Sequence, residues 1–128
     1  MNVPEAASDL VPVVICVNEA GLAISLELTL QVLGLTTIIH EPDEGLGAMP
    51  LDGHSTLIVD RGLLPRNPNP FFARLREQRW RGMAIILIED SALTEPVPLS
   101  AEGTVVLEKP FVAWDLLSLI HRGSGHSI

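Results

Sequence analysis

The sequence has a single cysteine and no long apolar run. Cys16 cannot form an internal disulfide, and its place in an apolar, strand-like segment indicates a small buried residue and not a nucleophile. No apolar run approaches the length that spans a bilayer, and the chain does not open on a basic segment followed by an apolar one. We therefore expect a soluble, cytoplasmic protein with no membrane partner.

Basic residues are also scarce. Eight Lys and Arg against sixteen Asp and Glu give a net charge of 8 − 16 = −8, and an acidic surface repels phosphates, so no DNA partner is expected. Six of the eight basic residues nevertheless lie between positions 61 and 81: Arg61, Arg66, Arg74, Arg76, Arg79 and Arg81. A solvated helix face is the ordinary explanation, and a site for an anionic ligand or an acidic partner is the functional one.

The sequence lacks the signatures of several enzyme classes. No glycine-rich loop follows the first apolar segment, 11–17, which disfavours a nucleotide-binding enzyme. The four histidines share no metal-ligand spacing, and none can be paired with a nucleophile: His40, His54, His121 and His126. We therefore expect a protein that is not an enzyme with a substrate of its own.

What the sequence does contain is a short apolar run, Ser55 to Val59, that ends in Asp60 and is followed by Gly62 and Pro65. Such a run, bounded by turn residues, is typical of a buried strand in a parallel sheet. Ligand chemistry in open α/β sheets lies just beyond the carboxyl ends of the strands, which is where Asp60 would be. The alternative is that Asp60 only caps the end of the strand.

Apolar segments alternate with helical patterns along the rest of the chain. Strands are expected at 11–17, 36–40, 55–60, 83–88 and 104–107, and helices at 22–33, at 71–81 and from Pro110 onward. The glycines and proline of 43–53 allow only a short second helix, and Pro96 and Pro98 allow at most one turn in 91–103.

This alternation predicts a three-layer α/β fold, in which helices cover both faces of a five-stranded parallel sheet and the fourth helix is shortened or disordered. A chain of 128 residues, 47% of them hydrophobic, forms about one domain. We place that domain at 11–122, with a flexible arm at 1–10 and a flexible tail at 123–128.

The order of these features resembles the receiver domain of bacterial response regulators, a CheY-like, flavodoxin-like fold with strand order 2-1-3-4-5. The resemblance rests on Leu57-Ile58-Val59-Asp60 and on Lys109-Pro110-Phe111, about fifty residues later. It implies that Asp60 is the phosphoacceptor of a histidine kinase or a phosphotransfer protein, assisted by Mg²⁺, and that Lys109 contacts the phosphoryl group. A carboxylate is a competent nucleophile towards phosphorus, and the transferred charge needs nearby cations.

The sequence departs from that pattern at the metal site. Receivers usually place two adjacent acids after the first strand, and the matching residues here are Val17 and Asn18, followed by Glu19. Valine cannot coordinate Mg²⁺, and asparagine offers only a neutral carbonyl. A weak Mg²⁺ site formed by Asn18, Glu19 and Asp60 is therefore the expectation.

It departs again at the residues that switch the conformation. The hydroxyl residue that usually ends the fourth strand is matched by Ile88, or by Glu89 one residue later, and neither supplies that hydroxyl. The usual aromatic residue of the fifth strand is replaced by Val106.

The resemblance thus implies a single-domain, atypical receiver in a phosphorelay that acts by protein–protein interaction, for example on a sensor kinase, with impaired metal binding and switching. One alternative is a pseudo-receiver that works without phosphorylation. Another is a sensor of an anionic nucleotide that uses the arginines from Arg74 to Arg81.

A homodimer is a further expectation, through the face formed by the fourth helix, fifth strand and fifth helix. Trp114, with Leu93, Val97 and Leu99, would supply an exposed apolar patch there. The alternative is that Trp114 covers the edge of the core.

Overall fold

The computed structural model describes residues 12–51, 53–89 and 103–123, with the side chains of the last helix described to Ile120. Its five strands are all parallel and lie in the order β2-β1-β3-β4-β5. The strands are β1 (Val13–Cys16), β2 (Thr37–Ile39), β3 (Thr56–Asp60), β4 (Ala84–Ile88) and β5 (Thr104–Glu108), and the α-helices are α2 (Ala20–Val32), α3 (Asn69–Glu77) and α4 (Ala113–Gly123). The predicted fold class and strand order are confirmed.

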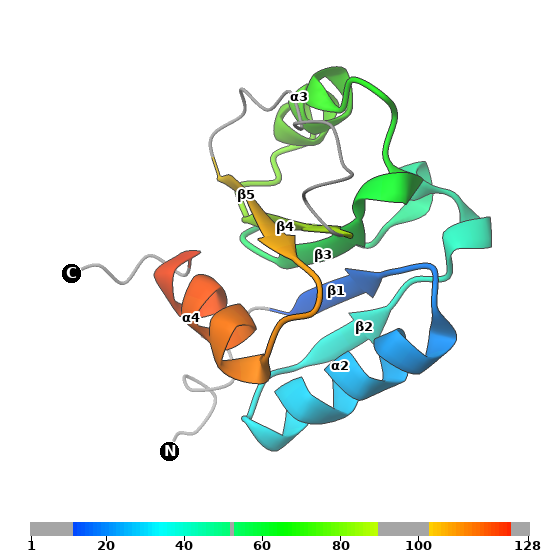
Figure 1. Cartoon of the computed structure of the whole chain (residues 1–128). Helices are drawn as coiled ribbons and strands as arrows, with labels where there is room; N and C mark the ends of the chain where they lie inside the picture. The colour runs from blue at the N-terminus through cyan, green and yellow to red at the C-terminus, as the bar shows by residue number, and fades with distance from the viewer. Residues whose placement is uncertain (1–11, 52, 90–102, 124–128) are drawn as a thin grey trace, which may run out of the picture.

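The elements form three layers, with α2 and α4 on one face of the sheet and α3 on the other (Figure 1). Alternate residues of each strand face opposite layers, as the pleat requires. In β1, Val13 and Ile15 pack towards α2 and α4, whereas Val14 and Cys16 pack towards α3. Because both faces of the sheet are covered, the central strands are apolar throughout, which is why their sequences are continuous apolar runs.

The first helix and the short second helical segment follow the prediction. Gly34, with φ of 89°, ends α2 in a left-handed conformation that glycine adopts without strain. Between β2 and β3 the described residues form two 3₁₀ turns, Pro42–Glu44 and Leu46–Ala48, and no α-helix. None of the helices in the described ranges is long and apolar enough to cross a membrane.

The helix α3 is shorter than predicted. It ends at Glu77, whereas the sequence pattern extended it to Arg81 and a stop at Gly82. Arg79 has a φ of 74°, and this left-handed residue turns the chain so that Trp80 points into the core, where it is 1% exposed. The indole Nε1 of Trp80 donates a hydrogen bond to the carbonyl of Ser55 at 2.7 Å. Burial of this large side chain outweighs continuation of the helix.

The last helix also differs from the prediction. It begins at Ala113, three residues after Pro110, and its buried residues are Leu116 and Ile120. Trp114 is 71% exposed, so it does not cover the edge of the core. The helix is oriented so that Leu116 and Ile120, not the indole, pack in the core with residues of β1 and β4.

Several predictions fall on residues outside the described ranges. They are the flexible arm at 1–10, the tail beyond Gly123 and the shortened fourth helix, with its apolar residues Leu93, Val97 and Leu99. Of the predicted dimer face only β5 and α4 are described. There Val106, Val112 and Trp114 are exposed, and the homodimer stays a prediction.

Cys16 provides a first testable consequence of the packing. Burial, and secondly the negative charge of Asp60, raise the pKa of its thiol to about 11. As the pH rises, the unfolded chain therefore loses the thiol proton before the folded protein does. The free energy of unfolding should be unaffected by Cys16 well below pH 9, where the thiol is protonated in both states, and should fall by about 2 kcal/mol as the pH approaches 11.

Urea unfolding of the wild type and of Cys16→Ala at several pH values measures this contribution. The wild type should lose more stability than the variant over the alkaline range, and the other titrating groups are common to both proteins. If the free energies of unfolding of the two proteins change with pH in parallel, the pKa of the Cys16 thiol is not raised in the folded protein.

Candidate functional site

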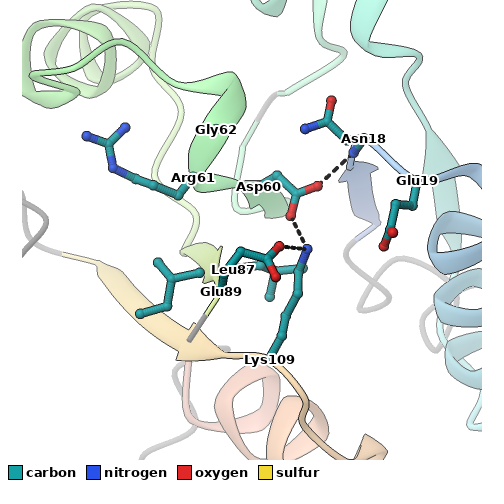
Figure 2. A pocket seen from close by; sticks show the side chains of 9 residues that line it. Asn18, Glu19, Asp60, Arg61, Gly62, Leu87, Glu89 and Lys109 are labelled. Carbon is teal, nitrogen blue, oxygen red and sulfur yellow. Dashed lines mark hydrogen bonds and ion pairs between the residues drawn. The ribbon is translucent and has the colours of Figure 1, made fainter. Parts of the chain in front are cut away.

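The carboxyl ends of β1, β3, β4 and β5 meet at one edge of the sheet and surround an open cavity. Asn18 follows β1, Asp60 ends β3, Glu89 follows β4 and Lys109 follows β5. The cavity has a volume of about 360 Å³, and its lining consists of Asn18, Glu19, Asp60, Arg61, Gly62, Leu87, Ile88, Glu89 and Lys109. The structure therefore brings together Asn18, Glu19, Asp60 and Lys109, the phosphorylation and metal-site residues that the resemblance implied (Figure 2).

Asp60 is a buried carboxylate, 4% exposed, with both oxygens bound. Its Oδ2 accepts a hydrogen bond from the backbone N–H of Asn18 at 2.7 Å, and its Oδ1 lies 2.8 Å from the Lys109 Nζ. These two charge-assisted contacts compensate the desolvation of the carboxylate. The side chain makes no capping hydrogen bond to the following 3₁₀ turn, Arg61–Leu63, so Asp60 is more than a strand cap.

Lys109, the single lysine of the sequence, bridges two carboxylates. Its Nζ lies 2.8 Å from Asp60 Oδ1 and 3.0 Å from Glu89 Oε2, and its side chain is 17% exposed. Burial, the largest single influence, lowers the pKa of Lys109, but the hydrogen bonds and charges of Asp60 and then Glu89 together raise it above its ordinary value. The ammonium therefore stays protonated at neutral pH.

Glu89 is the site residue whose role the sequence pattern did not identify. The backbone N–H of Lys109 donates to the carbonyl of Ile88 at 2.8 Å, and Ile88 is paired with Glu108 in the sheet. This register places Glu89 beside Lys109, while Ile88 packs partly against the α3 layer. Of the two residues matched to the missing hydroxyl, Glu89 is therefore the one that reaches the polar groups of the cavity. The sequence does contain a signal for this contact. Glu89 and Lys109 have opposite charges and directly follow two strands that are neighbours in the predicted strand order.

The donor set does not fit a tightly held Mg²⁺ ion. Val17 is 4% exposed and packs in the core with α2. Asn18 reaches Asp60 through its backbone N–H, and in Figure 2 the Glu19 side chain lies apart from the Asp60 carboxylate. Mg²⁺ prefers charged oxygens, and no group of three His, Cys, Asp or Glu side chains suited to a metal ion lies within the described residues. The weak metal site expected from the sequence stays a prediction.

Much of the arginine cluster is bound to the backbone of the protein itself. The guanidinium of Arg61 points away from Asp60 (Figure 2) and donates to the carbonyls of Pro65 and Arg66 at 3.0 and 2.8 Å. Two of the four arginines proposed for nucleotide binding are held in the same way: Arg76 donates to Trp80 and Gly82, and Arg81 to Arg76. The Arg76 guanidinium also stacks over the Trp80 ring, with 4.5 Å to the centroid.

Comparison with solved structures finds two close matches to this architecture. A crystal structure of FixJ-N matches with a TM-score of 0.63 and 20% identity over 92% of this chain and 96% of that one. A response regulator receiver protein from Sinorhizobium medicae WSM419 matches with the same TM-score and identity over 91% and 96%. The fold is that of a receiver domain. No protein-family model matches the sequence, and no curated protein does.

The receiver fold explains why the site residues converge. The strand order 2-1-3-4-5 places β1 between β2 and β3, and the topological switch point lies between β1 and β3. Asn18 and Asp60 follow those two strands, and Lys109 reaches across from the edge strand β5. The position of the cavity is thus a property of the topology, whereas its chemistry depends on the residues that this chain places there.

Proposed function

We propose that this chain is a receiver in a two-component phosphorelay, in which Asp60 accepts a phosphoryl group and Lys109 neutralises it. The observation that carries the proposal is the buried Asp60 carboxylate, held 2.8 Å from a protonated lysine at the edge of an open cavity. The donor would be a cytoplasmic histidine kinase or phosphotransfer protein. The domain would act on partners by binding them and not as an enzyme with a substrate of its own.

The chemistry follows from the charges. A carboxylate oxygen of Asp60 attacks phosphorus and forms a P–O bond, while the P–N bond to the donor histidine breaks. The electron pair of that bond returns to the imidazole, which takes up a proton from solvent. Lys109 carries its positive charge throughout and stabilises the negative charge on the phosphoryl oxygens.

The same geometry supports impaired metal binding and impaired switching. The cavity lacks a second acid after β1, and a carboxylate stands after β4 where a hydroxyl would donate to the phosphoryl group. These features favour a pseudo-receiver as the second candidate, one that binds its partners without phosphorylation. The nucleotide sensor has less support, because Arg76 and Arg81 are engaged with backbone carbonyls.

Amide NMR spectra recorded with Mg²⁺ and then with beryllofluoride, a mimic of the phosphoryl group, test the first candidate. In the wild type we expect shifts at Asn18, Asp60, Glu89 and Lys109, and in Asp60→Asn we expect none of them. Asp43→Asn removes the same charge from an exposed 3₁₀ turn and should behave as the wild type does. Phosphoramidate should label the wild type and Asp43→Asn alone.

An unresponsive wild type, with both beryllofluoride and phosphoramidate at high Mg²⁺ concentration, would be incompatible with phosphoryl transfer to Asp60. The pseudo-receiver would then be the better account.

A further inference from the structure

The cavity is lined by three carboxylates, those of Glu19, Asp60 and Glu89, and by two cations, Arg61 and Lys109. The Asp60 and Glu89 carboxylates both contact Lys109 Nζ, at 2.8 and 3.0 Å. Arg61 also lines the cavity, but its guanidinium is committed to the carbonyls of Pro65 and Arg66. Among the residues that the structure describes, Lys109 Nζ is therefore shared by two carboxylates before any phosphoryl group arrives.

A phosphorylated Asp60 carries about 1.5 to 2 negative charges near neutral pH, as a phosphate ester does, in place of the single charge of the carboxylate. Its oxygens need the N–H donors of Lys109, and one of those donors points at Glu89. The phosphoryl group and Glu89 then compete for one ammonium. A phosphoryl group bound to Lys109 would also repel Glu89, whose Oε2 lies 3.0 Å from the same nitrogen.

The three members of this cluster differ in how firmly they are held. The side chain of Asp60 is 6% exposed and that of Lys109 is 17% exposed, whereas that of Glu89 is 78% exposed. An exposed carboxylate keeps most of its hydration and is weakly bound by its ion pair. Glu89 is consequently the member that can leave Lys109 without rearrangement of the core.

We propose that Glu89 is an internal anion that competes with the phosphoryl group for Lys109 and thereby sets how readily Asp60 is phosphorylated. The inference rests on the proposed function of Asp60. It adds a residue that controls the rate of phosphorylation and that the resemblance of Asp60 and Lys109 to the receiver pattern does not identify. Glu89 acts by positioning Lys109 and does not itself contact the reacting phosphorus.

The test compares Glu89→Gln, which removes the charge and keeps the length, with Glu89→Thr, which also supplies a hydroxyl donor. Glu77→Gln makes the same change of net charge on the exposed side of α3, away from the cavity. Beryllofluoride affinity is read from NMR titration at fixed Mg²⁺ concentration, and the rate of labelling by phosphoramidate is read from the intact mass.

We expect Glu89→Gln to raise the affinity and the rate by about tenfold or more, equivalent to about 1.4 kcal/mol. Glu89→Thr should gain further, and Glu77→Gln should stay within about twofold of the wild type. The substitution sites are exposed, so all the variants should fold.

Two adverse outcomes are distinguishable. If the wild type responds and the Glu89 variants match it, this inference is wrong and the proposed function stands. If neither the wild type nor any variant responds, the proposed function and this inference are both overturned.

Discussion

Gly82→Ala is expected to lower the free energy of unfolding by about 4 kcal/mol, from overpacking and a disturbed buried hydrogen bond together. A Cβ atom at this position would overlap the carbonyl oxygen of Ser55 and would lie 2.6 Å from the indole Nε1 of Trp80. These are the two atoms that form the buried hydrogen bond. The Ser55 backbone cannot yield easily, because Thr56 follows it at the start of the central strand β3.

Urea unfolding of Gly82→Ala measures this effect, and failure of the variant to fold would agree with it. Gly47→Ala is the matched control, because a Cβ there meets nothing within 4 Å and the backbone has no left-handed φ. Its stability should stay within about 0.5 kcal/mol of the wild type. Equal effects of the two substitutions would show that the close approach of Gly82 to Ser55 is not a constraint on the fold.

Lys109→Met is expected to cost about 3 kcal/mol at neutral pH, the lower end of the range for breaking a buried ion pair. The variant keeps much of the aliphatic stem but leaves the buried Asp60 carboxylate with the Asn18 N–H as its one remaining partner among the contacts described above. Because Asp60 is the group left uncompensated, the same substitution in an Asp60→Asn background should cost less than about 1 kcal/mol.

A double-mutant cycle on Lys109→Met and Asp60→Asn, measured by urea unfolding, isolates this coupling. Glu89→Gln serves as the comparison, since loss of the exposed partner of Lys109 should cost less than about 1 kcal/mol. The raised pKa of Lys109 means that its contribution is complete below a pH of about 10.4 and is lost at higher pH. Additive costs at neutral pH would mean that Lys109 and Asp60 are not coupled.

The two predictions concern opposite ends of one strand. Ser55, against which Gly82 packs, directly precedes β3, and Asp60 ends it. The contact of Gly82 with Ser55 therefore fixes the position of β3 at its amino end. The charged cluster of Asp60, Glu89 and Lys109 lies at its carboxyl end, beside the cavity. Mutational effects on phosphorylation can be interpreted only with variants, such as Glu89→Gln, that leave this packing intact.

The sequence by itself determined the layout of the sheet. Continuous apolar runs separated by turn residues can be buried only as strands covered on both faces, and the parallel order follows from the helices between them. The parallel sheet rests on composition and spacing, which are local properties. The strand order and the pairing of Asp60 with Lys109 were implied by the resemblance to receiver domains, and the contact agrees with the rule that the carboxyl ends of parallel strands meet at one edge.

Only the tertiary structure decided how individual side chains are used. The end of α3 depends on the space that Trp80 fills beneath β3, and the choice of Leu116 over Trp114 depends on the rotation of α4 against the sheet. The contact between Glu89 and Lys109 depends on the register of β4 and β5, which neither segment encodes alone. Each of these three features depends on contacts with residues that are distant in the sequence. A local sequence pattern carries no information about the direction in which a side chain must point to make such a contact.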